Sequence, residues 1–219
     1  MKRFDDKRFQ ESLDTRVFGR SLIHLLEIGS TNDYSAGIID SVKDPEVDEI
    51  SGTLVLSDKQ TGGRGRFNHK WLSPHGGLWF SLIFKTVLSG SKVPALTLLA
   101  AYAAADILIN DYGININIKW PNDLYCADKK FGGILSEEKE VSGQRFIIMG
   151  MGLNIDIDRE FLEDLDNKAI NIQDLTEQAV IPERLLAGIM KRFEELYLCF
   201  SSTGDLGSIF KKIEKILRY

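Results

Sequence analysis

The hydrophobic residues of the chain follow a two-residue period in some segments and a helical period in others. The clearest two-residue period runs from Gly77 to Val87 and predicts a β-strand. One face of this strand would carry Leu78, Phe80, Leu82 and Phe84, and the other Trp79, Ser81, Ile83 and Lys85. Shorter apolar runs predict strands at 22–28, 53–57, 114–119, 124–126, 131–137 and 146–155.

Turn residues bound these strands. The run at 22–28 ends at Gly29 and is expected to be a buried strand. The polar residues 127–130 separate two runs that we expect to form a hairpin. Pro121 follows the strand at 114–119 and blocks further ladder pairing.

Helical periods appear from residue 94 onward. Pro94 opens a predicted helix, apolar on most sides, that runs to about Asp111 and is stopped by Gly113. Pro182 opens an amphipathic helix to Phe200, and a last helix is predicted over 206–217. Residues 1–20 are charged and predict a short helix or arm laid on the surface, and 41–51 predicts a solvated acidic connection.

Composition places the chain among folded globular proteins. Its 219 residues are 43% hydrophobic and 27% charged, which suits one domain with a normal core. The formal net charge of −5 argues against binding to duplex nucleic acid. The N-terminus lacks the apolar core of a signal peptide, and Pro94, Thr97 and Asp106 interrupt the longest apolar stretch, so no membrane span is predicted. Cys126 and Cys199 lie far apart in the sequence and have no metal-type spacing. A disulfide framework is therefore not expected, which fits a reducing cytoplasm.

One basic segment stands out in this acidic chain. The glycine–arginine loop, residues 60–71, reads Gln-Thr-Gly-Gly-Arg-Gly-Arg-Phe-Asn-His-Lys-Trp. Glycines allow a ligand to approach the backbone N–H groups, and arginines offer forked donors that match phosphate or carboxylate oxygens. Taken alone, the segment is either an exposed basic turn or a loop that holds an anion.

Two further strand ends favour the second interpretation. Lys119 to Asp123 follow one predicted strand, and Gly150 to Asn154 lie at the end of another, so three polar, glycine-bearing ends can converge on one site. Ser30, Thr31, Asn32 and Asp33 stand at a strand-to-helix junction. They are either helix-cap residues or ligand contacts at the open end of the sheet.

These motifs resemble, in order, those of the biotin protein ligases. The resemblance rests on Ser-Thr-Asn at 30–32, Gln-Thr-x-Gly-Arg-Gly-Arg at 60–66, Trp-x-Ser-Pro-x-Gly-Gly-Leu at 71–78, Lys-Trp-Pro-Asn-Asp at 119–123, Gly-Gly-Ile-Leu-x-Glu at 132–137 and Gly-x-Gly-x-Asn at 150–154. It implies an α+β fold with a mixed, mostly antiparallel sheet flanked by helices, like that of class II aminoacyl-tRNA synthetases and of the biotin–lipoate ligase catalytic domain.

The resemblance also implies a two-step ligase reaction. The biotin carboxylate would attack the α-phosphate of ATP, with Mg²⁺, to give biotinyl-5′-AMP and pyrophosphate. A lysine of a biotin carboxyl carrier protein domain would then take the biotin and release AMP. The glycine–arginine loop would close over the intermediate and exclude water.

The family motifs imply roles for individual residues. The implied catalytic residues are Lys119, Arg64 and Arg66. The implied biotin-binding residues are Ser30, Thr31, Asn32, Gln60, Gly63, Arg64 and Gly133; the implied ATP- or adenylate-binding residues are Arg66, Trp71, Lys119, Asn122 and Asn154. No metal ligand is assigned. His69 is left out as a loop histidine, and Glu137, Glu138 and Glu140 are taken as a solvated acidic strand end rather than a metal site.

Other expectations concern domains and partners. Nothing before Ser21 has the length of the DNA-binding module that some family members carry, so no nucleic acid is expected as a partner. Members continue into a small β-barrel, which is expected to be absent or truncated here because the chain ends at Tyr219. A homodimer is possible. The alternatives are a lipoate or octanoate ligase, and a biotin- or adenylate-binding protein without transfer activity.

Overall fold

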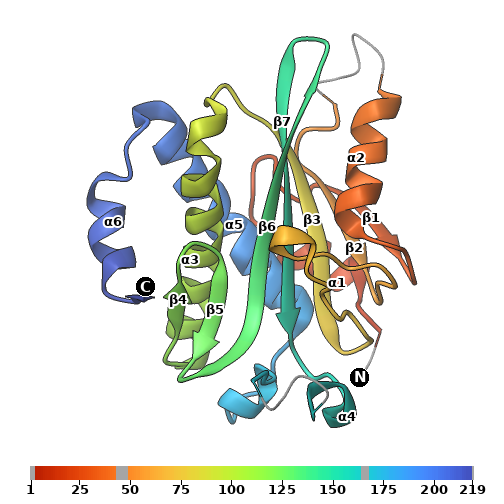
Figure 1. Cartoon of the computed structure of the whole chain (residues 1–219), viewed down its shortest axis with the longest axis vertical. Helices are drawn as coiled ribbons and strands as arrows, with labels where there is room; N and C mark the ends of the chain where they lie inside the picture. The colour runs from red at the N-terminus through yellow and green to blue at the C-terminus, as the bar shows by residue number, and fades with distance from the viewer. Residues whose placement is uncertain (1–2, 43–48, 164–167, 219) are drawn as a thin grey trace.

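The fold is built on one mixed β-sheet whose strands come from the whole length of the chain (Figure 1). The computed structural model describes residues 3–42, 49–163 and 168–218. The strands are β1 (Ser21–Leu25), β2 (Thr53–Ser57), β3 (Gly77–Lys85), β4 (Asn117–Lys119), β5 (Asp123–Cys126), β6 (Lys129–Val141), β7 (Gln144–Asn154) and β8 (Leu217–Arg218). They lie in the order β1-β2-β3-β7-β6-β5-β4-β8, and only the β1–β2 and β4–β8 pairs of this described sheet are parallel. The predicted mixed, mostly antiparallel sheet is confirmed.

Helices cover the two faces of the sheet unequally. They are α1 (Asp6–Ser12), α2 (Thr31–Ser41), α3 (Val93–Tyr112), α4 (Arg159–Glu163), α5 (Pro182–Thr203) and α6 (Gly207–Glu214). The main core lies between one face and α1, α3 and α5, and it takes the predicted β3 row that begins at Leu78. The other β3 row meets α2, where Ile83 packs with Ile39, Phe146 and Ile148. Because α2 covers only part of this second face, the remainder is free to carry a pocket.

Helix α3 begins and ends as its sequence predicts. Pro94 lies in its first turn, and Gly113 ends it with a left-handed φ of 69°. Among the residues described, Gly90–Tyr112 is long and apolar enough to cross a membrane by length and composition, but 61% of its apolar 18-residue stretch is buried inside the protein. Packing of α3 between β6 and α5 accounts for its apolar composition.

The N-terminal segment is part of the core, which corrects the prediction of a surface arm. The predicted short helix is present as α1, but Phe9 and Phe18 are buried. Two glutamates of α5 also hold this segment. Glu183 accepts a hydrogen bond of 2.8 Å from the Asp5 amide, and the Glu194 carboxylate accepts three, of 2.6–2.8 Å, from the amides of residues 16–18. A charged sequence hid these anchors, because their partners lie far along the chain.

Several predicted elements differ in extent from the observed ones. Strand β1 stops at Leu25 and is half-exposed at the sheet edge, so the prediction of a buried strand over 22–28 was wrong. The predicted strand at 114–119 is regular only as β4, and the predicted helix over 206–217 ends at Glu214 because the chain then adds β8 beside β4. Residues 43–48 of the predicted acidic connection lie outside the described residues.

Candidate active site

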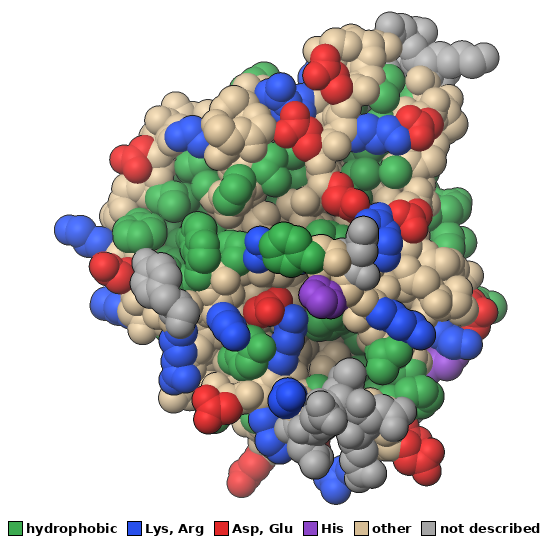
Figure 2. Space-filling view, in the orientation of Figure 1, with side chains coloured by type: hydrophobic (Ala, Val, Ile, Leu, Met, Phe, Trp, Pro, Cys, Tyr) green, Lys and Arg blue, Asp and Glu red, His purple; other side chains and the backbone are tan. Residues whose placement is uncertain are grey.

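A pocket of about 800 Å³ opens on the face of the sheet that α2 leaves uncovered. Its walls come from the glycine–arginine loop, the first turn of α2, and strands β5, β6 and β7. Ten of the twelve candidate residues line it: Ser30, Thr31, Asn32, Gln60, Arg64, Arg66, Trp71, Asn122, Gly133 and Asn154. Gly63 and Lys119 do not. Figure 2 shows Lys, Arg, Asp and Glu side chains around a histidine near the centre of this face, where the short helix of the loop crosses the sheet in Figure 1.

One end of the pocket is polar but neutral. Ser30 caps α2, with its Oγ 3.4 Å from the Asp33 amide, so the helix-cap interpretation is confirmed. Gln60 Oε1 accepts hydrogen bonds from the Thr31 amide at 2.8 Å and the Thr31 hydroxyl at 3.1 Å. Gln60 Nε2 donates to Ser73 Oγ at 2.8 Å. Both ends of the Gln60 amide are therefore fixed, and the side chain presents a defined donor–acceptor edge.

Asn32 lies in the wall of the pocket and joins α2 to the sheet. Its Nδ2 donates to Glu137 Oε2 at 2.6 Å and lies 3.3 Å from the Leu135 carbonyl oxygen, while Ser81 Oγ donates to its Oδ1 at 2.6 Å. A Cβ at Gly150 would lie 2.2 Å from that Oδ1. The absence of a side chain at Gly150 therefore makes room for the Asn32 side chain.

Two carboxylates hold Arg64. Its Nη1 and Nη2 form a fork with the Glu137 carboxylate, each contact measuring 3.1 Å, and Nη2 also donates to Asp33 Oδ1. The hydrogen bonds to Glu137 first, and then to Asp33, raise the pKa of Arg64. The sequence pattern predicted Glu137 to be a solvated strand end and Asp33 to be either a helix-cap residue or a ligand contact. The sequence gives no sign of these contacts, because Asp33 and Glu137 lie far from Arg64 along the chain and meet it only in the fold.

The other end of the pocket is cationic. Arg66 Nη1 donates to Asn122 Oδ1 at 3.1 Å, and Asn122 Nδ2 donates to the Ile134 carbonyl oxygen at 3.1 Å. Lys130 lies across the pocket, with its Nζ 2.8 Å from Asp123 Oδ1 and 4.9 Å from the centre of the Trp71 ring. Lys130 escaped sequence reasoning because it was assigned to the polar turn of the hairpin, whereas β6 begins at Lys129.

Trp71 forms an inner wall over two glycines. A Cβ at Gly152 would lie 2.6 Å from Trp71 Nε1, and one at Gly133 would lie 3.4 Å from the indole ring. The Nε1 atom is buried and has no hydrogen-bond partner, and the ring meets Trp79 edge to face at 6.5 Å. Trp71 therefore both lines the pocket and packs against a small apolar cluster.

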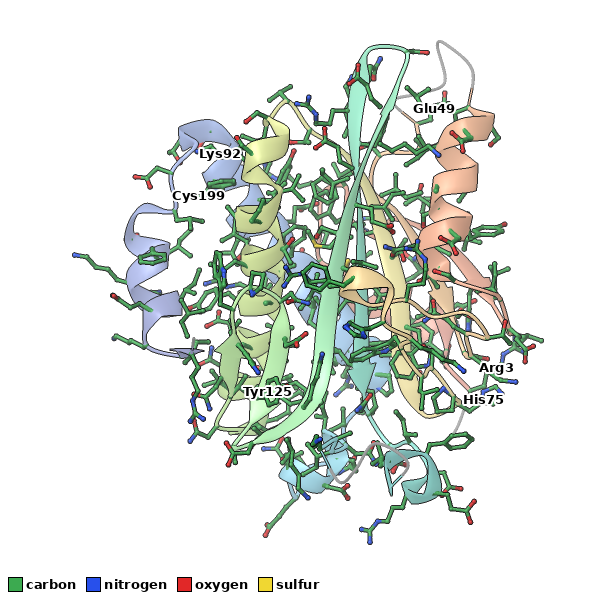
Figure 3. All side chains as sticks on the ribbon, in the orientation of Figure 1. Arg3, Glu49, His75, Lys92, Tyr125 and Cys199 are labelled. Atoms are coloured by element: carbon green, nitrogen blue, oxygen red, sulfur yellow. The ribbon has the colours of Figure 1, made fainter. Side chains whose placement is uncertain are left out.

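Lys119 stands at the outer rim of the cationic end. It lies on β4 opposite Asp123, on the same face of the sheet as the pocket, and its Nζ is 5.9 Å from the centre of the Tyr125 ring. Tyr125 lines the pocket and is visible on the β5 side in Figure 3. Burial raises the pKa of the Tyr125 phenol, and Asp123 adds to this effect. Within the described residues, neither Lys119 nor Arg66 has a carboxylate partner within 4 Å, so both charges are available to an anion.

The loop tip, residues 64–70, forms a narrow hairpin above the pocket. Arg64 and Lys70 make an antiparallel bridge, the Gly65 amide donates to the His69 carbonyl oxygen at 2.7 Å, and a 3-10 turn spans Arg66–Asn68. Phe67 has a left-handed φ of 54° and is 82% exposed. His69 also lines the pocket, although sequence reasoning left it out of the site.

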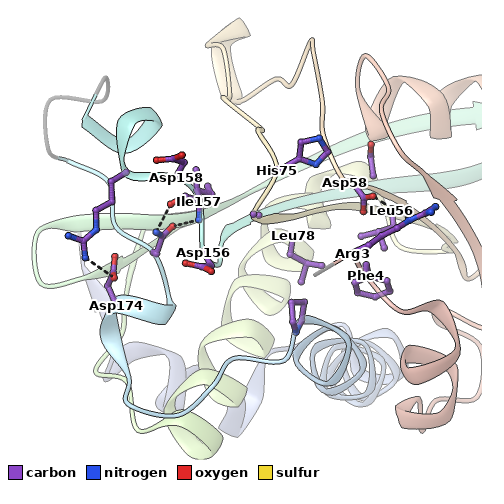
Figure 4. Close-up of a pocket in the computed structure, with 16 residues that line it drawn as sticks. Arg3, Phe4, Leu56, Asp58, His75, Leu78, Asp156, Ile157, Asp158 and Asp174 are labelled. Atoms are coloured by element: carbon purple, nitrogen blue, oxygen red, sulfur yellow. Dashed lines mark hydrogen bonds and ion pairs between the residues drawn. The ribbon is translucent and has the colours of Figure 1, made fainter. Parts of the chain in front are cut away.

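A second cavity of about 660 Å³ lies beyond the far end of β2 (Figure 4). Its lining comes from the N-terminal segment, the end of β2, the start of β3 and residues 156–182, and includes Arg3, Asp58, His75 and Asp156. Arg3 and Arg159 each lie within 4 Å of an aspartate of this wall. Among the described lining residues, the motifs that carry the family resemblance are represented by His75 and residues 76–78 of the 71–78 motif.

The combination of a neutral polar end and a cationic end suits a ligand that joins an uncharged polar group to phosphates. Cations at fixed positions stabilise charge that develops on phosphorus, and a pocket that excludes water strengthens this effect. The described residues include no cluster of three or more His, Cys, Asp or Glu side chains that could hold a metal ion.

Comparison with known proteins defines the class. Residues 30–154 match the model of the biotin/lipoate A/B protein ligase family. This segment covers more than half of the chain and holds all the candidate site residues. The chain therefore belongs to the biotin/lipoate A/B protein ligase family.

Named relatives and solved structures agree with this assignment. The chain is 33% identical over 205 residues to the bifunctional ligase/repressor BirA of Bacillus subtilis, covering 92% of this chain and 61% of the relative. It is 30% identical over 220 residues to biotin–protein ligase 2 of Arabidopsis thaliana, covering 97% and 62%. The chain thus spans about three fifths of the length of these relatives. The structure of a biotin protein ligase from Aquifex aeolicus in complex with biotin and ATP matches with a TM-score of 0.74 and 28% identity, covering 91% of this chain and 79% of that one. The fold predicted from the resemblance is confirmed.

Proposed function

We propose that the chain is an ATP-dependent biotin ligase that forms biotinyl-5′-AMP and then transfers biotin to a lysine of a biotin carboxyl carrier protein domain. The observation that carries the proposal is one pocket with Gln60 and Thr31 at a neutral end and Arg66, Lys130 and Lys119 at or near a cationic end. The named relatives are biotin ligases, and the Aquifex structure contains biotin and ATP.

The residues divide the work of the first step. Ser30, Thr31 and Gln60 would bind the ureido ring of biotin, whose donors and acceptor need partners when buried. A biotin carboxylate oxygen attacks the α-phosphorus of ATP, the bond to the β-phosphate oxygen breaks, and pyrophosphate leaves. Lys119 and Arg66 lie where they could offset the repulsion between the carboxylate and the phosphates. Trp71 and Asn154 would line the nucleotide side.

Mg²⁺ belongs to the proposal as the companion of ATP. Its protein sites commonly use one or two carboxylates together with substrate phosphates. Here Asp123 is paired with Lys130, and Asp33 and Glu137 are paired with Arg64. The described residues that line the pocket therefore offer no set of free carboxylates, so Mg²⁺ would be held mainly by the phosphates.

In the second step the carrier lysine, as a neutral amine, attacks the carbonyl carbon of the mixed anhydride. An amide forms, AMP leaves with the electrons of the broken bond, and the amine loses a proton. The proposal includes a biotin carrier domain as the protein partner, assembly as a homodimer and a location in the cytoplasm. Cys126 and Cys199 are both free thiols, which suits a reducing compartment.

One assay tests the function. The protein is incubated with Mg-ATP and either biotin or lipoate, and both pyrophosphate release and labelling of a biotin carrier domain are followed. We expect pyrophosphate and labelling with biotin. Absence of pyrophosphate with biotin would contradict the proposal, and activity with lipoate alone would reassign the acid. Pyrophosphate without labelling would indicate an adenylate-forming protein that does not transfer.

Substitution of Gly133 by alanine should weaken biotin binding with little effect on stability. The new methyl would lie 3.2 Å from Asp123 Oδ1 and 3.5 Å from Lys130 Cε, both near the ends of side chains that can move, and in ordinary contact with the Trp71 ring at 3.4 Å. One extra methyl in a fitted pocket changes affinity about tenfold or more. Calorimetric titration with biotin measures the effect. Gly37→Ala is the control, since a Cβ at Gly37 would meet no atom within 4 Å. Unaltered biotin binding by Gly133→Ala would show that Gly133 does not contact biotin.

A further inference from the structure

The Arg64 guanidinium gathers three separate parts of the protein. Arg64 belongs to the loop tip, Asp33 to the first turn of α2, and Glu137 to β6. The fork to Glu137 fixes the plane of the guanidinium as well as its position. Asn32 in turn fixes Glu137 through its 2.6 Å hydrogen bond. The loop tip is thus attached to two rigid elements through one side chain.

Few other hydrogen bonds hold the loop tip. The base of the loop is tied by its backbone, from the Gly62 amide to the Gly29 carbonyl oxygen at 2.7 Å and from the Gln60 amide to the Ser73 carbonyl oxygen at 2.9 Å. Beyond Gly63, the backbone hydrogen bonds of the tip stay within the loop. In the described part of the protein, Arg64 and Arg66 supply the hydrogen bonds from the tip to other elements.

The charge balance separates the roles of these two arginines. Arg64 faces two carboxylates, so the group carries a formal net charge of −1 and does not attract an anion. Arg66 contacts the neutral amide of Asn122 and keeps its charge available. A ligand phosphate is therefore drawn toward Arg66 and Lys119 rather than toward Arg64.

We propose that Asp33 and Glu137 are positioning residues that hold Arg64, and with it the loop tip, closed over the pocket, so that the activated acid is retained until transfer. The retention part of this proposal rests on the proposed ligase function, whereas the closure of the tip does not.

Proteolysis of the free protein tests the closure. Chymotrypsin cleaves after Phe67, which is exposed at the tip, but a protease needs several residues around the cut to leave their folded positions. In the double variant Asp33→Asn with Glu137→Gln, we expect cleavage at Phe67 about tenfold faster than in the wild type. Raising NaCl should speed cleavage of the wild type, because salt screens this partly exposed pair, and should leave the double variant unaffected.

A matched control exists on the same two elements. Asp40 of α2 pairs with Lys139 of β6 outside the pocket, so Asp40→Asn removes an α2–β6 ion pair without touching the loop. Its cleavage at Phe67 should equal that of the wild type. Equal cleavage rates for the double variant and the wild type would overturn the proposal, and so would a matching increase in Asp40→Asn.

Single-turnover chemistry tests the retention. When the tip opens, water can add its oxygen to the carbonyl carbon of the adenylate, so that biotin, AMP and a proton are released. We expect the double variant to raise the ratio of AMP released without carrier to pyrophosphate formed by about tenfold. Loss of pyrophosphate formation together with normal cleavage at Phe67 would mean that these carboxylates act on the ligand, which overturns the proposal. If the wild type forms no pyrophosphate from biotin, the ligase function fails, and the cleavage comparison still decides the closure.

Discussion

Substitution of Lys119 by alanine is expected to slow pyrophosphate release from biotin and Mg-ATP by about 10²- to 10³-fold, the usual cost of removing one fixed group that stabilises charge in the transition state. The Lys119 ammonium lies at the rim of the cationic end, 5.9 Å from the Tyr125 ring. Its side chain is exposed, so its removal leaves no buried charge unpaired. Steady-state kinetics measures the rate of pyrophosphate release, and a thermal melt checks that Tm is unchanged.

Lys129→Ala is the matched control for this prediction. Lys129 is exposed at the start of β6 and does not line the pocket. We expect near-normal turnover from it. Lys119→Arg should recover only part of the rate, because a forked guanidinium does not replace a compact ammonium. Normal adenylation by Lys119→Ala would refute the role assigned to Lys119.

Substitution of Glu194 by alanine is expected to be the most destabilising change tested. The residue is 7% exposed, and its carboxylate accepts hydrogen bonds from the amides of Arg16, Val17 and Phe18. Each amide left without an acceptor costs about 1 kcal/mol or more, so the free energy of unfolding should fall by about 3 kcal/mol or more. For a domain of this size, that lowers Tm by about 6–12 °C.

The neighbouring residue on α5 provides the comparison. Glu195 is exposed and pairs with Arg192 at 3.1 Å, so Glu195→Ala should change stability by less than about 1 kcal/mol. Glu194→Gln keeps one acceptor oxygen and should lie between the two. Equal melting temperatures for Glu194→Ala and Glu195→Ala would show that the N-terminal segment is not held by the Glu194 carboxylate.

Local patterns predicted the fold well wherever burial sets the period. The two rows of β3 and the ends of α3 at Pro94 and Gly113 follow directly from their residues. Prediction failed where distant partners decide the outcome. Strand β8 exists because β4 offers it a free edge, and Phe9 is buried because α5 lies above it.

The candidate site shows the same division. Motif residues such as Gln60 and Asn122 come together in one pocket, as the converging strand ends suggested. The roles of these residues remain predictions. The carboxylates on Arg64 and the position of Lys130 depend on the register of β6 against its neighbours, which no local pattern specifies. An ion pair between residues far apart in the sequence produces no periodic pattern from which it could be predicted.

The pairing of β3 with β7 has a consequence for how the molecule acquires its site. Gly77 lies opposite Asn154, so the centre of the sheet joins residues far apart along the chain. Contacts of such long range form slowly, because the intervening segment must be brought together first. During synthesis, the glycine–arginine loop leaves the ribosome well before Gly150 and Gly152, the glycines beneath Asn32 and Trp71. A nascent chain that stops short of Asn154 thus has the loop but lacks the β7 strand against which Asn32 and Trp71 pack. Ligand binding can begin only after β7 has been added to the sheet.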